Sequence, residues 1–158
     1  MKVAKEQRNA QKNLVSLYWD WQNVRVSSHQ AKCLLNFASV QGDLYIKKVY
    51  AYWRRENQRI EEALYNLSFD CLNIPSFTKN SVDRKLIADC KLEVLNNSAI
   101  NIVILISGDG DFASLVRELK GKDKKVIIFA QTQASKKLIS LANKSYSVSQ
   151  IPFSEQVA

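Results

Sequence analysis

The sequence predicts an α/β protein with three layers, in which a mostly parallel sheet of five or six strands lies between two layers of helices. Strand-like and helix-like segments alternate along most of the 158 residues, which is typical of this class. Residues 102–106 form an unbroken apolar run that ends in the turn 107–111, as expected of a parallel strand buried on both faces. Apolar residues at helical spacing follow over 112–119, so this strand leads directly into a helix.

The first half of the chain contains three predicted strands and two predicted helices. Residues 14–19 are the first strand, and the turn Asp20-Trp21-Gln22-Asn23 follows. An apolar stripe of Ala31, Leu34, Leu35 and Ala38 predicts a helix over about 28–40. Residues 43–53 are rich in Tyr, Ile and Val and predict the second strand. The second helix is marked by Ile60, Ala63, Leu64 and Leu67, and the third strand spans 69–74, before Pro75.

The second half continues the alternation. Residues 76–81 form a loop before a helix whose apolar positions are Leu86, Ile87, Cys90, Val94 and Leu95. The apolar strand that ends at Ile106 and its helix follow, and we expect Gly121 to cap the end of this helix. Residues 125–130 are the fifth strand, and residues 147–151 are a candidate edge strand. The last helix is marked by Leu138, Leu141 and Ala142.

Composition and charge limit the classes of function. With 46% hydrophobic residues and few Gly and Pro, the chain fits one folded domain over 14–151, flanked by a basic arm over 1–13 and a tail over 152–158. The 23 Lys and Arg against 15 Asp and Glu give a formal charge of +8, which attracts polyanions such as nucleic acid. Many basic proteins bind no nucleic acid, so charge alone does not decide the partner.

The chain lacks the features of a membrane or exported protein. It has no apolar stretch near the roughly 20 residues of a membrane helix, and its polar N-terminus does not look like a signal peptide. We therefore expect a cytoplasmic protein with no membrane partner. Its three cysteines, Cys33, Cys71 and Cys90, match no zinc pattern and lie in apolar segments, which predicts buried, reduced thiols.

Acidic residues follow the first and fourth strands. The carboxyl ends of parallel strands meet at one edge of a sheet, where α/β proteins bind ligands, so Asp20 and Asp109 are expected at that edge. Asn23 and Ser107 lie in the same two turns. Capping roles remain open as alternatives, because Asp20 suits a turn and Asp111 suits the start of the next helix.

A third polar group lies at the start of the third predicted helix. Asp83 is expected at the ligand edge, either as a metal ligand or as the N-cap of this helix. Asp89, six residues later, does not share one helical face cleanly with Asp83. Lys79 is either a phosphate-binding residue or a solvated loop lysine.

A divalent cation would make such an acidic cluster tolerable. Converging carboxylates repel one another unless a cation neutralises them. Mg²⁺ binds one or two carboxylates together with waters and phosphate oxygens, and such an ion promotes phosphoryl displacement without a strong general base. The lone histidine, His29, is expected at the surface and argues against a Ser-His-Asp triad. The chain has no P-loop, no dinucleotide-binding glycine motif and no EF-hand loop.

Three short sequence motifs follow one another along the chain. They are Asp20-Trp21-Gln22-Asn23, then Lys79 to Asp83 with Asp89, then Ser107-Gly108-Asp109-Gly110-Asp111-Phe112. In this order and spacing the chain resembles the NYN domain family, PIN-like nucleases that include the LabA-like group, over residues 14–150. It departs from the family at Asn80, where glycine is frequent, and at Gly110, where serine is frequent.

The resemblance implies a PIN-like fold with strand order 3-2-1-4-5 and a ribonuclease site that depends on Mg²⁺ or Mn²⁺. The family's acidic positions are matched by Asp20, Asp83, Asp109 and Asp111, which are therefore the expected catalytic residues and metal ligands. The residues expected at the substrate are Asn23 and Lys79, which match the family's asparagine and lysine, and Ser107. Some members of such families are thought to bind without cutting.

Basic and aromatic residues interleave on and after the second strand. The set comprises Lys47, Lys48, Tyr50, Tyr52, Trp53, Arg54 and Arg55. Such mixtures bind single-stranded nucleic acid, whereas the alternative is core packing of the rings and solvation of the charges. Arg54 and Arg55 are expected to bind substrate because they follow the strand at the active edge. Trp19 is expected in the core and Trp21 near the cleft. The lysines at the opposite edge, Lys120, Lys122, Lys124 and Lys125, are expected to be solvated.

These observations together predict a cytoplasmic, Mg²⁺- or Mn²⁺-dependent endoribonuclease with RNA as its partner. A non-catalytic RNA-binding or regulatory protein on the same scaffold is the alternative. A metal-dependent phosphatase acting on a small phosphoester is a third hypothesis, against which the positive charge argues. A homodimer is left open.

Overall fold

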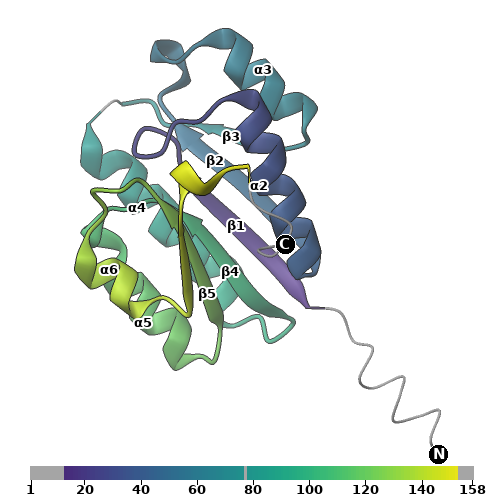
Figure 1. Cartoon of the computed structure of the whole chain (residues 1–158). Coiled ribbons are helices and arrows are strands. Elements are labelled where there is room, and N and C mark those ends of the chain that lie inside the picture. Colours follow the sequence, from purple (N-terminus) through teal and green to yellow (C-terminus); the bar gives the residue numbers. More distant parts are fainter. Residues whose placement is uncertain (1–12, 77, 153–158) are drawn as a thin grey trace, which may run out of the picture.

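The structure, a computed structural model, describes residues 13–76 and 78–152, so residues 1–12 of the predicted arm and 153–158 of the predicted tail lie outside it. Six strands form one sheet in the order β3-β2-β1-β4-β5-β6, with every neighbouring pair parallel (Figure 1). They are β1 (Leu14–Asp20), β2 (Asp43–Ala51), β3 (Asp70–Asn73), β4 (Ile100–Ile106), β5 (Lys125–Ala130) and β6 (Lys144–Ser147). The predicted fold class and strand order are confirmed, and β6 extends the sheet beyond β5.

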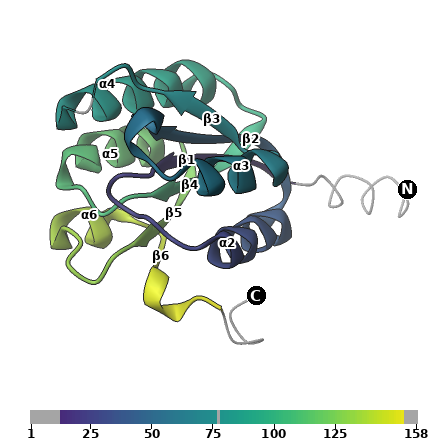
Figure 2. The same ribbon diagram turned by 90° about the horizontal axis from the view of Figure 1, so that it is seen from above.

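Helices cover both faces of the sheet (Figure 2). The apolar sides of α2 (Ser28–Gln41) and α3 (Gln58–Asn66) pack on one face, and those of α4 (Lys79–Cys90), α5 (Ala113–Gly121) and α6 (Lys136–Leu141) pack on the other. Alternation along β1 sends Leu17 and Trp19 into the first core and Tyr18 into the second. No helix among the described residues is long and apolar enough to cross a membrane.

The two strands that carry the main acidic turns lie side by side in the centre of the sheet. Trp19 at the end of β1 pairs with Ile106 at the end of β4. From β1 the chain passes to β2 on one side, and from β4 it passes to β5 on the other. Connections that diverge in this way leave a crevice at the carboxyl edge of the sheet, which is where the acidic turns emerge.

The predictions for the end of α5 and for the last strand are wrong in detail. The residue with a left-handed backbone after α5 is Asp123, with φ of 61°, whereas Gly121 is the last helical residue. The edge strand covers Lys144–Ser147 and not residues 147–151. The chain leaves the sheet at Ser147, which caps a 3₁₀ turn, because Val148 and Ile151 turn inward to join the core.

The amino edge of the sheet contains a lysine that was expected in solvent. Lys124 is 7% exposed, and its Nζ donates hydrogen bonds to the backbone oxygens of Asn97 at 2.7 Å and Ile100 at 2.6 Å. Burial lowers its pKa. Lys124 therefore ties the β5 entry to the start of β4, while Lys120 and Lys122 are exposed as expected.

The cysteines are free thiols, as predicted. Cys90 is buried between α4 and the sheet, and burial raises its pKa to about 12. Cys33 and Cys71 are only partly buried, so the expectation of burial holds fully for Cys90 alone. Burial likewise raises the pKa of Cys71, to about 11, which keeps both thiols protonated and unreactive at neutral pH.

Candidate metal centre

Three carboxylates from distant parts of the sequence converge at the carboxyl edge. One side-chain oxygen each of Asp20, Asp83 and Asp109 lies within 4.8 Å of the other two. Asp20 is the last residue of β1, Asp83 lies in the second turn of α4, and Asp109 lies in the turn after β4. Asp20 and Asp83 are buried, with 5% and 7% exposure, and Asp109 is half-buried, so the cluster has a buried floor and one accessible side.

Ser107 links the carboxylate of Asp20 to the backbone of the turn that carries Asp109. Its hydroxyl donates to Oδ2 of Asp20 at 3.3 Å and accepts from the backbone N–H of Asp109 at 3.2 Å. The residue is fully buried. Ser107 is also a predicted substrate residue, and in the structure these contacts orient Asp20 and the turn of Asp109.

The turn after β4 is held by short side chains and close backbone contacts. Asp109 caps the 3₁₀ turn Gly110–Phe112, and its Oδ1 accepts from the N–H of Asp111 at 2.9 Å. The capping alternative named Asp111, but the residue that caps this turn is Asp109. Asp111 is exposed and lies outside the group of three converging carboxylates.

A second contact joins this turn to the turn after β1. Oδ1 of Asn23 accepts from the N–H of Gly108 at 2.8 Å. Gly108 is required here because a Cβ would lie 2.7 Å from the Cβ of Ala134 in the β5–α6 loop. Asn23, predicted at this site, thus fixes the spacing between the Asp20 and Asp109 segments.

Helix α4 supplies Asp83 but not by capping. Its N-cap is Thr78, so the alternative in which Asp83 is the N-cap of this helix is wrong. Asp83 lies one turn inside the helix, where a side chain can face the sheet edge. Lys79 is the first helical residue, but its side chain lies outside the described part of the structure.

Asp89 anchors the same helix and does not reach the cluster. It accepts from the hydroxyl of Tyr50 at 2.7 Å and pairs with Lys85 at 2.9 Å. Burial acts to raise its pKa, but the hydrogen bonds from Lys85 and Tyr50 and the positive charges of Lys48 and Lys85 together leave the pKa lowered. The weak helical alignment of Asp89 with Asp83, read from the sequence, agrees with this separate role.

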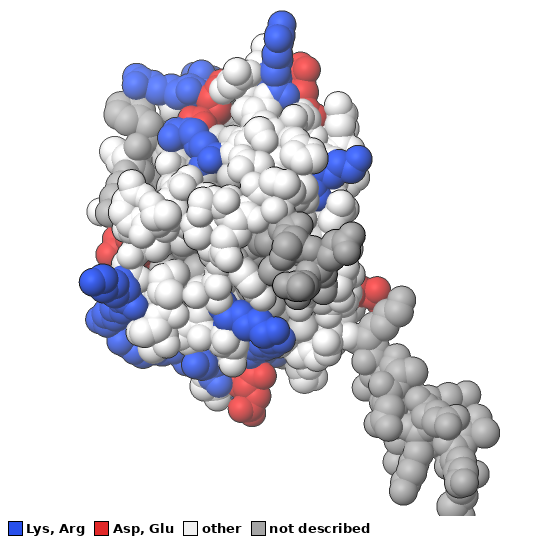
Figure 3. Space-filling model, viewed as in Figure 1, with Lys and Arg blue, Asp and Glu red and all other residues white. Residues whose placement is uncertain are grey.

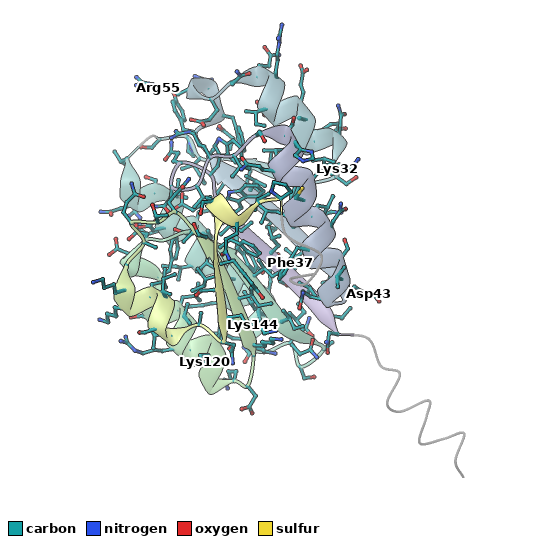
Figure 4. The ribbon with its side chains drawn as sticks, viewed as in Figure 1. Lys32, Phe37, Asp43, Arg55, Lys120 and Lys144 are labelled. Atoms are coloured by element: carbon teal, nitrogen blue, oxygen red, sulfur yellow. The ribbon has the colours of Figure 1, made fainter. Side chains whose placement is uncertain are left out.

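The basic residues after β2 lie beside the acidic turns. Arg54 and Arg55 form the 3₁₀ turn Trp53–Arg55 and are exposed. Figure 4 shows Arg55 at the opposite end of the molecule from Lys120 and Lys144. In the sheet, β2 lies beside β1 and runs parallel to it, so the exposed basic turn after β2 lies next to the end of the strand that carries Asp20.

An ion pair that sequence analysis missed ties this basic turn to the β1–α2 loop. Nε and Nη2 of Arg25 contact the two carboxylate oxygens of Glu56 at 2.7 and 2.8 Å. The hydrogen bond from Arg25 lowers the pKa of Glu56, so this carboxylate is charged at neutral pH. No pattern in the sequence signals this pair, because its members come from separate loops.

Most of the aromatic residues near the site belong to the core. Trp21, expected near the cleft, is 2% exposed, and Tyr50 and Trp53 are also buried. Trp19, Trp21 and Trp53 form a chain of rings, with centroids 5.3 and 6.1 Å apart. The alternative of core packing is therefore right for Tyr50 and Trp53, whereas Arg54 and Arg55 are the exposed arginines of this segment.

The donor set fits a hard divalent cation. Three carboxylate oxygens within 4.8 Å repel one another strongly in a partly buried site, and a cation removes this cost. Oxygen-only ligands suit Mg²⁺ and Mn²⁺ rather than metals that prefer nitrogen or sulfur. Asp20, Asp83 and Asp109 are the described residues placed to hold such an ion.

The positive charge of the protein is not gathered on the face that Figure 3 shows. On this face the Lys and Arg side chains lie in separate groups with uncharged residues between them. The described residues of this face therefore form no continuous basic surface for a polyanion. The carboxyl edge, with its acidic cluster and the neighbouring Arg54 and Arg55, remains the better candidate for a phosphate-bearing ligand.

A parallel sheet with converging carboxylates at its central crevice defines a nuclease-like α/β protein. A family model, the NYN domain, matches residues 14–150, and the chain belongs to this family. NYN domains have PIN-like character, are generally ribonucleases and act on RNA. A comparison with curated proteins found no match.

Proposed function

We propose that this protein is a metal-dependent endoribonuclease that cleaves RNA phosphodiester bonds. The observation that carries the proposal is the convergence of Asp20, Asp83 and Asp109, whose positions span ninety residues of sequence, into one partly buried group. Carboxylates this close repel one another, and a bound divalent cation would offset that repulsion. Membership of the NYN family supports RNA as the substrate.

The proposed site has buried carboxylates on one side and an exposed carboxylate on the other. Asp20, Asp83 and Asp109 hold Mg²⁺ or Mn²⁺, and Asp111 adds a fourth carboxylate at the exposed rim. When bound, such an ion makes water more acidic and stabilises the negative charge that develops at the phosphate during displacement. Ser107 keeps Asp20 oriented by donating a hydrogen bond from below, so the carboxylate is positioned before substrate arrives.

Neighbouring residues position the RNA. Oδ1 of Asn23 is engaged by Gly108, which leaves its amide N–H groups to donate to an oxygen of the scissile phosphate. Arg54 and Arg55 bind the backbone on the β2 side of the cluster, because exposed guanidinium groups pair well with phosphates. Lys79, at the start of α4, is proposed as a further phosphate ligand.

The test is cleavage of a panel of single-stranded and structured RNAs with Mg²⁺, with Mn²⁺ and with EDTA. We expect cleavage with a metal and none with EDTA. Asp109→Asn should lower the rate at least about 100-fold while RNA binding is kept or strengthened, because one carboxylate that repels phosphate is gone. Asp111→Asn should cost about tenfold, since this side chain lies at the rim.

Asp123→Asn is the matched control, because Asp123 is exposed beyond the far end of α5 and Asn tolerates its left-handed backbone. RNA binding without cleavage in either metal would favour the non-catalytic alternative. Hydrolysis of a small phosphomonoester in preference to RNA would favour the phosphatase. Cleavage by Asp109→Asn at the wild-type rate would remove the proposed mechanism.

A further inference from the structure

A cavity of about 560 Å³ opens at the carboxyl ends of β5 and β6, on the opposite side of the acidic cluster from Arg54 and Arg55. Its walls come from the end of β5, the β5–α6 loop, α6 and β6. Volumes of this order suit small organic groups.

The lining combines apolar walls with hydrogen-bonding groups. Ala130, Ala134 and Ile139 supply apolar surface. Gln131 and Ser145 supply an amide and a hydroxyl, and neither side chain has a hydrogen-bond partner among residues 13–76 and 78–152. A flat heteroaromatic ring with polar edges is the chemistry that such a lining accepts.

The cavity is joined directly to the turn that carries Asp109. The backbone N–H of Ser135 donates to the oxygen of Gly108 at 2.9 Å, and Ala134 packs so closely on Gly108 that a Cβ there would lie 2.7 Å away. Helix α6 also contacts the 3₁₀ turn Gly110–Phe112. The cavity wall and the turn that carries Asp109 are therefore in direct contact, so the cavity and the acidic cluster are neighbours at the carboxyl edge of the sheet.

Charge distinguishes this cavity from a larger one. A cavity of about 1,090 Å³ lies between α3 and β3, but Glu61, Glu62 and Asp70 line it. Three carboxylates with no lysine or arginine in the lining would repel the phosphates on either side of a bound base. The cavity beside β6 has no acidic residue in its lining and includes Lys136, which can meet a neighbouring phosphate.

We propose that the cavity between the β5–α6 loop and β6 is a nucleobase subsite that receives one unpaired base of the RNA next to the scissile phosphate. This proposal rests on the nuclease function proposed above for the placement of the strand. The apolar walls cover the faces of the base, Gln131 and Ser145 bind its edge, and Lys136 pairs with the adjacent phosphate. The substrate class is accordingly RNA that is single-stranded at the cut, because a base held in a duplex cannot leave the stack to enter the cavity.

The first measurement uses the wild-type protein and needs no variant. Single abasic substitutions are placed at each position of a single-stranded oligoribonucleotide, and binding is measured in EDTA so that nothing is cut. We expect one position to weaken binding about tenfold, as for the loss of a stacked base, and its neighbours to have little effect. In Mn²⁺ the sensitive position should fall within two nucleotides of the cleavage site. Equal effects at all positions would overturn the proposal.

The second measurement fills the cavity. Ser145→Phe adds a ring on the α6 side of an exposed edge strand, which tolerates aromatic residues, and Lys144→Phe adds the same bulk one residue earlier, outside the lining. Ser145→Phe should weaken binding of intact RNA about tenfold and abolish the sensitivity to the abasic position, whereas Lys144→Phe should do neither. Retention of the abasic effect in Ser145→Phe would overturn the subsite.

The two proposals fail in different ways. Metal-dependent cleavage with no position-specific abasic effect leaves the nuclease and removes the subsite. A position-specific effect in EDTA without cleavage in either metal leaves the subsite and removes the nuclease.

Discussion

Replacing Asp109 by Asn should stabilise the metal-free protein, although it removes a site residue. Asp109 faces two other carboxylates at no more than 4.8 Å. At an effective dielectric constant of about 20, each such pair costs about 3.5 kcal/mol when both groups are charged. Because Asp109 is half-exposed, water screens most of this repulsion, and we expect a net gain of about 1–2 kcal/mol in the free energy of unfolding.

The choice of Asn isolates the charge. The Asp109 side chain also caps the following 3₁₀ turn by accepting from the N–H of Asp111 at 2.9 Å, and an Asn oxygen caps equally well. For a domain of this size the expected gain corresponds to a rise in Tm of about 3–6 °C in EDTA. Asp123→Asn, an isolated surface change, should leave Tm unchanged.

Metal should reverse the order of the two proteins. Mn²⁺ at 100 times its Kd stabilises the wild type by about 2.7 kcal/mol, or about 8 °C, and the variant should lose most of this increment. The assay is thermal unfolding followed by fluorescence, in EDTA and over a Mn²⁺ series. A lower Tm for Asp109→Asn in EDTA, together with an unchanged response to Mn²⁺, would refute the argument that these carboxylates repel one another and share an ion.

Three further predictions concern residues that support the site. Gly108→Ala should destabilise the protein by about 1–3 kcal/mol, because the new methyl group would lie 2.7 Å from the β5–α6 loop. Gly121→Ala, which has open space around it at the end of α5, should be neutral or stabilising by up to about 1 kcal/mol, and urea unfolding compares the two variants. Glu56→Gln should lower stability at pH 7 by about 1 kcal/mol through loss of the Arg25 ion pair. The pKa of Glu56 is lowered in the folded state, so its contribution is complete above the unfolded pKa of about 4.3 and is lost as pH falls through the folded value. A difference from wild type that does not shrink as the pH is lowered below about 4.3 would contradict this. Tyr50→Phe should lower the free energy of unfolding by about 1–3 kcal/mol and the apparent affinity for Mn²⁺ severalfold, because the Tyr50 hydroxyl donates to Asp89 of α4 at 2.7 Å and so holds this helix against the sheet. Calorimetric titration of the folded variant with Mn²⁺ measures the affinity separately from stability. An unchanged affinity would show that α4 is positioned by packing alone.

Much of the fold was visible in local patterns. The apolar run of β4 predicts a strand and the apolar stripe of α2 predicts a helix, because a strand buried on both faces and a helix buried on one face have different hydrophobic periodicities. Details at element ends were less predictable. The last strand ends at Ser147 because Val148 and Ile151 turn into the core, a contact that no local pattern shows.

Some features of the candidate site were likewise predictable from the sequence, and others were not. Asp20 and Asp109 could be placed because each directly follows a strand, and parallel strands end at a common edge. The role of Asp109 as a cap, the burial of Trp21 and the contact between Asn23 and Gly108 could not be placed, since each depends on how two segments pack together. The Arg25–Glu56 pair and the cavity beside β6 carry no sequence signal for the same reason.

The order of strands and helices along the chain, and with it the placing of acidic residues at strand ends and near the start of α4, follows from local patterns in the sequence. This is so because hydrophobic periodicity and turn residues act over a few positions. Which carboxylates share a site depends on tertiary packing, which brings Asp20, Asp83 and Asp109 within 4.8 Å, leaves Asp111 exposed and turns Asp89 toward Tyr50. Those outcomes depend on the twist of the sheet and on the packing of α4 against it, which are properties of the whole chain.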